Sequence, residues 1–175
     1  GFPCDLVRCD TTLASRDMVN HLLSLGHRRI AAIGPKMPST LGGERLNGYM
    51  QAMAAAGLET NGLVLLEGWR TRDGYNMTHH LLDQTMPDAF FAFGPRIAAG
   101  CANALRERGL RIPEDVALAC VDDFGIGSEL DPFMTVVKQP EREMGKCVGE
   151  MLIDRILERY TGEPRELILP AEIVI

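Results

Sequence analysis

Hydrophobic and polar residues follow one another along this chain with two different periods. Short apolar runs, such as residues 30–33 and 116–121, are typical of strands that are buried on both faces. Between these runs lie longer stretches whose apolar residues recur every three or four positions, which indicates amphipathic helices. The pattern predicts strands at residues 5–9, 30–33, 63–66, 88–93, 116–121 and 135–138, and helices at residues 13–25, 42–56, 73–84, 96–108 and 141–160.

The regular succession of strands and helices predicts an α/β fold. Parallel strands that are joined by helices form a sheet covered on both faces, so we expect a three-layer sandwich with a parallel sheet. Gly26, Gly57 and Gly109 are placed to end three of the predicted helices, because glycine readily takes the left-handed conformation that closes a helix.

The C-terminal residues follow a different pattern. After the strand at 135–138, the predicted helix at 141–160 carries a long apolar row, and residues 166–175 are predicted to form one final strand. An exposed apolar row of this length would associate, so we expect it to pack on a second copy of the chain or to fold back against its own lobe. The row consists of Met144, Cys147, Val148, Met151, Leu152, Ile156 and Leu157.

Composition narrows the class of partner. The chain has 175 residues and a formal net charge of −6, so nothing in its bulk charge attracts a nucleic-acid backbone. No apolar stretch approaches the roughly 18 residues that a membrane span needs, and no signal peptide is visible. The five cysteines are odd in number and show no CxxC spacing, which favours reduced thiols in the cytoplasm.

Motifs for catalysis or for metal binding are weak. The sequence has no GxSxG elbow, no P-loop and no GxGxxG. His79 and His80 are neighbours in a predicted helix, where their side chains point about 100° apart, so they make a poor pair of metal ligands. We therefore expect no enzymatic activity, no cofactor and no metal.

Polar side chains with binding chemistry follow the predicted strands, where an α/β sheet holds its ligands. Arg45 offers the planar guanidinium that suits a carboxylate or paired hydroxyls, and Asp122 ends the strand at 116–121. Trp69, the only tryptophan, offers a face for stacking on a ring, with core packing as the alternative. A catalytic pair formed by Asp122 and Asp123 is a weaker alternative, because adjacent residues at a strand end point in opposite directions. We expect Asp123 to cap the following loop instead.

Several motifs together resemble the LacI/GalR (lactose-repressor) family of transcription regulators. They are LLSLGHRRIAAIGPKMPSTLGGERLNGY at residues 22–49, IPEDVAL at 112–118, DD at 122–123 and TVVKQP at 135–140. The resemblance implies a periplasmic-binding-protein-like core, of which residues 1–134 would be the C-terminal lobe. Residues 135–162 would be the crossover strand and helix that return to a missing first lobe, and residues 163–175 the final strand that rejoins the second. The helix-turn-helix that binds operator DNA would also lie outside this chain.

The resemblance also implies an effector site. The arginine that matches Arg45 and the aspartate that matches Asp122 contact the effector in the family, and Gln139 resembles a family position near the lobe boundary. Where the family often has Asn-Asp, this chain has Gly94-Pro95 after the strand at 88–93. This departure leaves two interpretations, namely room for a bulkier ligand or an apolar wall supplied by Phe93.

The helix after Gly94 is implied to pack on its own copy across a two-fold axis. The alternative is that the same face covers the sheet. The expected function is therefore the ligand-sensing and dimerisation core of a cytoplasmic regulator, with a sugar or sugar acid as effector. A solute-binding protein of a transport system is the alternative. The expected dimer residues are Ile97, Ala98, Cys101, Ala102 and Leu105.

Overall fold

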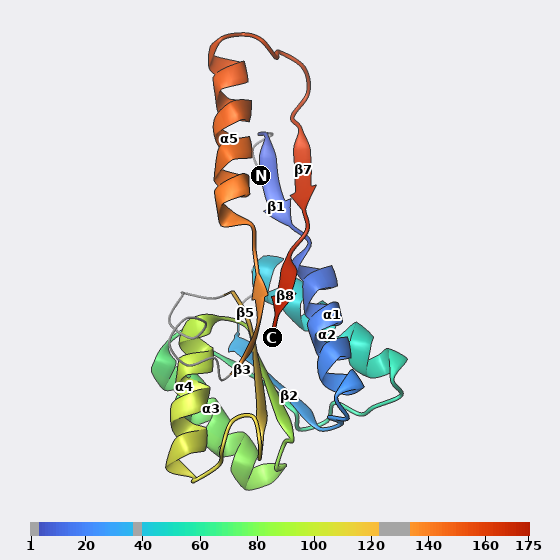
Figure 1. Cartoon of the computed structure of the whole chain (residues 1–175), viewed down its shortest axis with the longest axis vertical. Coiled ribbons are helices and arrows are strands. Elements are labelled where there is room, and N and C mark those ends of the chain that lie inside the picture. Colours follow the sequence, from blue (N-terminus) through green and yellow to red (C-terminus); the bar gives the residue numbers. More distant parts are fainter. Residues whose placement is uncertain (1–3, 37–39, 123–133) are drawn as a thin grey trace. The chain divides into compact units, whose positions relative to one another are not determined.

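The computed structural model describes residues 4–36, 40–122 and 134–175 (Figure 1). Its strands are β1 (Leu6–Cys9), β2 (Ile30–Pro35), β3 (Val64–Glu67), β4 (Ala89–Ala92), β5 (Ala117–Val121), β6 (Thr135–Lys138), β7 (Glu166–Leu169) and β8 (Glu172–Val174). Its helices are α1 (Thr11–Ser24), α2 (Thr40–Ala55), α3 (Thr71–Gln84), α4 (Pro95–Glu107) and α5 (Glu141–Ile156).

The described residues fall into two compact units. The smaller unit combines the residues up to Asp10 with Gln139–Glu172, and the larger unit combines Thr11–Lys138 with Ile173–Ile175. None of the helices in the described ranges is both long enough and apolar enough to cross a membrane.

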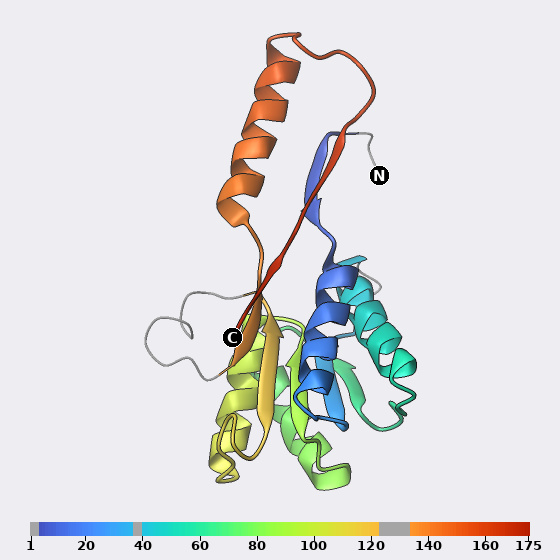
Figure 2. The same cartoon turned by 45° about the vertical axis from the view of Figure 1, so that its right-hand side comes forward.

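The larger unit is built on a sheet with the strand order β3-β2-β4-β5-β6-β8. The neighbouring strands from β3 to β6 all pair in parallel. Helices α1 and α2 cover one face of this sheet, and α3 and α4 cover the other (Figures 1 and 2). The predicted three-layer α/β fold is thereby confirmed.

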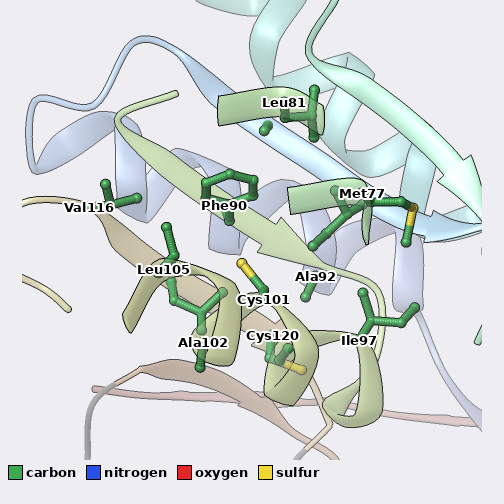
Figure 3. Close-up of a cluster of buried hydrophobic side chains, with 14 of the residues drawn as sticks. Met77, Leu81, Phe90, Ala92, Ile97, Cys101, Ala102, Leu105, Val116 and Cys120 are labelled. Atoms are coloured by element: carbon green, nitrogen blue, oxygen red, sulfur yellow. The ribbon is translucent and has the colours of Figure 1, made fainter. Parts of the chain in front are cut away.

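Two-sided burial explains why the central strands are apolar at nearly every position. In β4, Phe90 and Ala92 face α3 and α4, where they pack with Met77 and Leu105 (Figure 3). Phe91 alternates to the opposite face and is equally buried. Full burial of one such side chain contributes roughly 1.5–3 kcal/mol to the stability of the fold.

Helices α3 and α4 approach each other at the level of the backbone. A Cβ atom on Gly74 would overlap the main chain of Ile97, and one on Gly100 would overlap the main chain of Thr71 and Tyr75. Steric contact therefore explains why both positions are glycine, because a side chain at either one would push the two helices apart.

The smaller unit consists of the parallel pair β1 and β7 with α5 beside β1. No residue of α5 is fully buried, and the Leu152 side chain is 57% exposed. Together with Val148 and Met151, Leu152 lines a hollow of about 620 Å³ that β1 also borders. The apolar row predicted for this helix is present, and its packing partner stays a prediction.

The C-terminal segment differs from the prediction in three ways. The strand expected at 166–175 is two strands in different sheets, because Pro170 lacks an N–H group for the ladder; β7 pairs with β1, and β8 lies beside β6. Helix α5 ends at Ile156 rather than at residue 160, since Glu158 takes a left-handed backbone conformation with φ 53°. Strand β6, expected in the crossover segment, belongs to the sheet of the larger unit.

Candidate functional site

Four connections leave the six-stranded sheet at its carboxyl edge and carry the candidate side chains. Strand β2 leads to α2 and Arg45, β3 leads to Trp69, β4 leads to Gly94, and β5 leads to Asp122. Strand β2 lies between β3 and β4 in the sheet. After β2 the chain adds β3 on one side, and it then crosses back to add β4 on the other side, so the strand order changes direction at β2. Ligands of α/β sheets bind outside the carboxyl ends of the strands at such a switch point.

Arg45 is the centre of this cluster. Its side chain is almost fully buried, with a relative exposure of 5%, and its Nη2 lies 2.8 Å from Asp122 Oδ2. Its Nη1 donates a hydrogen bond to the carbonyl oxygen of Phe93. The Nε–H group is also buried, and it has no hydrogen-bond partner among the described residues. The Arg45 guanidinium thus joins the ends of β4 and β5. Its Nε–H group remains without a hydrogen bond to any described residue.

Asp122 occupies the first position after β5. Its N–H group donates to the carbonyl of Val137 at 3.0 Å, and its φ of 70° lies in the left-handed region, which aspartate tolerates better than most residues. The carboxylate is partly exposed, with 27% of the side-chain surface accessible, so a ligand can reach it while Arg45 stays covered.

Trp69 and Gly94 lie together beside Arg45. A Cβ atom placed on Gly94 would be 3.3 Å from Trp69 Cζ3 and 4.0 Å from Arg45 Nη1. Trp69 has a relative accessibility of 37% over the whole residue, so it is not a core residue. Arg45, Trp69, Gly94 and Asp122, which lie far apart in the sequence, therefore form one cluster.

Phe93 and Gln139 take other positions. The Phe93 side chain is fully buried, packs edge-on against Phe91 at 5.4 Å between ring centroids, and fills the space left by Gly34. Full burial of the side chain argues against Phe93 as an apolar ligand wall, which stays an untested prediction, and the carbonyl group of this residue accepts a hydrogen bond from Arg45. Gln139 belongs to the smaller unit and stays a predicted contact. Asp123 lies outside the described residues.

The five expected dimer residues of α4 face inward. Ile97, Ala98, Cys101, Ala102 and Leu105 are at most 2% exposed and pack in the core between α4, α3 and the sheet (Figure 3). Their burial supports the alternative that this face covers the sheet, because fully covered side chains leave no surface for a second copy. Burial also raises the pKa of the Cys101 thiol to about 12, which keeps this group uncharged.

The mutual ion pair of Arg45 and Asp122 was not anticipated from the sequence. Each residue was expected to reach a ligand by itself, although both follow neighbouring parts of one sheet edge and carry opposite charges. A second unanticipated contact involves the residue before Arg45, because the buried Thr11 hydroxyl donates to the carboxylate of Glu44. Within the described ranges, no group of three or more His, Cys, Asp or Glu side chains is arranged to hold a metal ion.

Comparisons with known proteins show which family this fold and sequence resemble. A family model described as a periplasmic binding protein-like domain matches residues 19–175. The regulator CelR of Thermobifida fusca is 36% identical over 171 residues, which are 97% of this chain and 50% of that protein. The ribose operon repressor of Escherichia coli is 30% identical, over 95% of this chain and 51% of that protein. This chain spans about half the length of these curated relatives.

Solved structures agree with the sequence comparisons. A complex of the regulator CelR with cellobiose superposes with a TM-score of 0.90 at 34% identity, covering 99% of this chain and 53% of that one. A LacI-family regulator from Enterococcus faecium with bound ribose superposes with a TM-score of 0.89 at 30% identity, covering 98% and 63%. The chain belongs to the family of periplasmic binding protein-like domains and, within it, to the LacI-family transcription regulators.

Proposed function

We propose that this chain is the effector-binding part of a cytoplasmic LacI-family regulator and that its effector is a sugar bound at the carboxyl edge of the larger sheet. The observation that carries the proposal is the buried Arg45 guanidinium, paired with the reachable Asp122 and retaining an Nε–H group without a partner in the described chain. A buried donor left unsatisfied costs roughly 1–3 kcal/mol, which a ligand hydroxyl would remove if the Arg45 side chain shifted toward the ligand on binding.

The chemistry of the cluster suits a polyhydroxylated ring. Arg45 donates hydrogen bonds, the Asp122 carboxylate accepts them, and the exposed part of the Trp69 ring offers an apolar surface. A sugar presents hydroxyl groups around its edge and C–H groups on its faces, so it matches both kinds of surface. The cellobiose and ribose in two structurally similar regulators support this ligand class.

The charge balance of the cluster favours a neutral sugar over a sugar acid. The positive charge of Arg45 is already compensated by Asp122 at 2.8 Å, and its Nη1 is engaged by the Phe93 carbonyl. A carboxylate ligand would compete with Asp122 for the same guanidinium and would place two like charges close together. We therefore expect neutral sugars to bind more tightly than the corresponding acids.

Isothermal titration of the longest natural chain that contains these residues tests the proposal. The panel consists of neutral mono- and disaccharides, sugar acids and nucleobases. We expect a neutral sugar to bind and the Asp122→Ala variant to lose this binding. The matched control is Asp115→Ala. Asp115 forms an exposed ion pair with Arg111 and precedes the N-terminal end of β5, so this variant also removes one carboxylate, at the opposite end of the strand.

Two outcomes would overturn the proposal. One is binding that survives Asp122→Ala, which would move the site away from the Arg45 cluster. The other is equal loss of binding in Asp115→Ala, which would show that the variants act through folding rather than through ligand contacts.

The role in transcription extends beyond the residues of this chain. We propose that ligand binding alters the operator affinity of the whole protein by favouring one of two states of its core. A DNA mobility shift that changes with the sugar supports this role. A protein that binds the sugar but no DNA would instead favour the solute-binding alternative.

The expected homodimer is retained in this proposal without the five buried α4 residues. A symmetric contact along this helix would have to use its exposed positions Arg96, Ala99, Asn103, Arg106 and Glu107. Light scattering on the whole protein measures the oligomeric state directly.

A further inference from the structure

The Asp73 carboxylate lies against both residues that flank Trp69 in the chain. Asp73 belongs to the first turn of α3, and its Oδ2 accepts a hydrogen bond from the backbone N–H group of Arg70 at 2.8 Å. The same oxygen lies so close to Gly68 that a Cβ atom added there would be only 2.1 Å away. One carboxylate therefore contacts the residue before Trp69 and the residue after it.

Stabilisation of the helix accounts for only part of this arrangement. A carboxylate in the first turn interacts favourably with the positive end of the helix dipole. The N–H group that Asp73 engages, however, belongs to Arg70, the N-cap residue, which precedes the first turn. The Arg70 guanidinium carries donors only, so it cannot return a capping hydrogen bond to the helix. The hydrogen bond of Asp73 thus holds the loop in front of α3.

The turn that carries Asp73 is supported by the core of the larger unit. A Cβ atom on Gly100 of α4 would overlap the main chain of Thr71 and Tyr75, so the first turn of α3 rests directly on the backbone of α4. The other end of Trp69, its ring, lies beside Gly94 at the start of α4. The loop at residues 68–70 is therefore joined through Asp73 to a firmly packed helix pair.

We propose that Asp73 is a positioning residue of the site, whose carboxylate holds residues 68–70 so that Trp69 presents its ring beside Arg45 before a ligand arrives. Asp73 acts through Trp69 and does not itself touch the ligand. The inference rests on the proposed function, because that function makes Trp69 a ligand contact. A ring that is ordered in advance loses less conformational freedom on binding, so Asp73 contributes to affinity from outside the contact surface.

Three substitutions in the longest natural chain that contains these residues separate positioning from helix stabilisation. Asp73→Ala removes the acceptor, whereas Asp73→Asn removes the charge and keeps an oxygen for the Arg70 N–H group. Gly68→Ala leaves Asp73 in the chain but displaces its carboxylate. The control is Asp83→Ala in the last turn of the same helix, where the carboxylate forms an exposed ion pair with Arg108.

Fluorine NMR of protein labelled with fluorotryptophan observes Trp69 directly, and Trp69→Phe identifies its resonance. Asp73→Ala and Gly68→Ala should move this resonance toward its position in the urea-unfolded protein, whereas Asp73→Asn and the control should leave it in place. Gly68→Ala should add little to Asp73→Ala, because it acts by displacing a carboxylate that the double variant lacks. Melting temperatures within a few degrees of the natural protein exclude unfolding as the cause.

Titration with cellobiose and with D-ribose measures the consequence for binding. Asp73→Ala and Gly68→Ala should raise the dissociation constant of the bound sugar by roughly 2- to 10-fold, which corresponds to ordering one side chain during binding instead of before it. Asp73→Asn and Asp83→Ala should keep the dissociation constant of the natural protein.

Three results would overturn the inference. They are an unchanged Trp69 resonance in Asp73→Ala, equal effects of Asp73→Asn and Asp73→Ala, and a natural dissociation constant in Asp73→Ala. If one of them occurs while Asp122→Ala still abolishes sugar binding, the proposed function stands and only the role of Asp73 fails. If the natural protein binds neither sugar, the role of Asp73 in affinity fails together with the sugar assignment, and the resonance still decides whether Asp73 orders the ring.

Discussion

A buried arginine and a half-covered aspartate hold the ends of two central strands together. Arg45 reaches the Phe93 carbonyl after β4 and the Asp122 carboxylate after β5, so one side chain joins the ends of these two strands. Under the proposed function, ligand binding and local stability depend on the same ion pair. A change at Asp122 has to be judged by both measurements.

Asp122→Ala is expected to lower the free energy of unfolding by about 1–3 kcal/mol, because the buried Arg45 charge would lose its partner. Partial exposure of Asp122 keeps the loss below that of a fully buried pair. Urea denaturation of the variant measures it. Asp122→Asn, which retains an oxygen acceptor, should recover part of the difference, and an unchanged midpoint for Asp122→Ala would show that water replaces the carboxylate.

At this scale the sequence predicts positions better than contacts. The motif around Arg45, the strand end at Asp122 and the lone tryptophan predict that these three residues lie at one edge of the sheet, as they do in the structure. The pairing of Arg45 with Asp122 depends on the register of β4 and β5, which no local pattern contains. The burial of Phe93 could have been predicted from the sequence, because Phe93 lies two residues after Phe91 and therefore shares its buried face.

At the scale of elements, α4 shows why composition alone does not distinguish a dimer interface from a contact within the chain. Its small and apolar residues allow close approach to any flat partner, and that partner in the structure is the sheet with α3 of the same chain. The periodicity predicted the helix within one residue at each end. It did not distinguish an intramolecular from an intermolecular contact, since both require the same apolar stripe.

Two neighbouring alanines of α4 separate these cases experimentally. Ala98 is fully buried, whereas Ala99 is exposed. Ala98→Arg should lower the free energy of unfolding by about 4 kcal/mol or more, because it places a charge in the core. Ala99→Arg should change it by less than about 0.5 kcal/mol. Thermal unfolding followed by circular dichroism measures both, and a stable Ala98→Arg protein would contradict the packing described for this helix.

Helix α5 presents the opposite case, with apolar side chains that its own unit leaves partly open. Leu152 is 57% exposed and Ile156 is 68% exposed. Leu152→Glu should therefore change thermal stability by less than about 0.5 kcal/mol while it reduces self-association measured by light scattering. A large loss of stability in this variant would show that Leu152 is covered in solution.

At the scale of the whole molecule, contacts distant in sequence hold the smaller unit together. The Asp5 carboxylate accepts hydrogen bonds from Arg155 at 2.7 Å and from the Arg165 backbone N–H at 2.8 Å, with Arg165 Nη2 at 3.0 Å. Both guanidinium groups also stack on the Tyr160 ring, at 4.6 and 4.3 Å from its centroid. An N-terminal strand is thereby fixed to the segment that follows α5. No sequence motif indicated this cluster, because Asp5 lies 150 residues from Arg155 and 160 from Arg165.

Acidification should weaken this cluster. The Arg155 side chain, followed by the Arg165 backbone N–H, holds the pKa of Asp5 well below its usual range. The folded unit is therefore stabilised at pH values above about 4, the unfolded value, and this stabilisation is lost as the pH falls toward the folded pKa. Hydrogen exchange of β1 and β7 should accelerate from about pH 4 downward relative to the intrinsic rate.

A neutral side chain at this position should remove the effect. Asp5→Asn should exchange faster than the natural protein at pH 7 and lose the acid dependence below pH 4. Glu150→Gln is the control, because the Lys146–Glu150 pair in the same unit is exposed and contributes little. A natural protein whose exchange stays unchanged between pH 5 and pH 2 would contradict this account.

The backbone contact between α3 and α4 has a mechanical consequence for the candidate site. Trp69 and Gly94 lead directly into these two helices, and Gly74 and Gly100 leave no clearance between them. The two helices therefore cannot approach each other more closely, and a ligand that pressed on the start of either helix would have to move the pair together or give up this backbone contact.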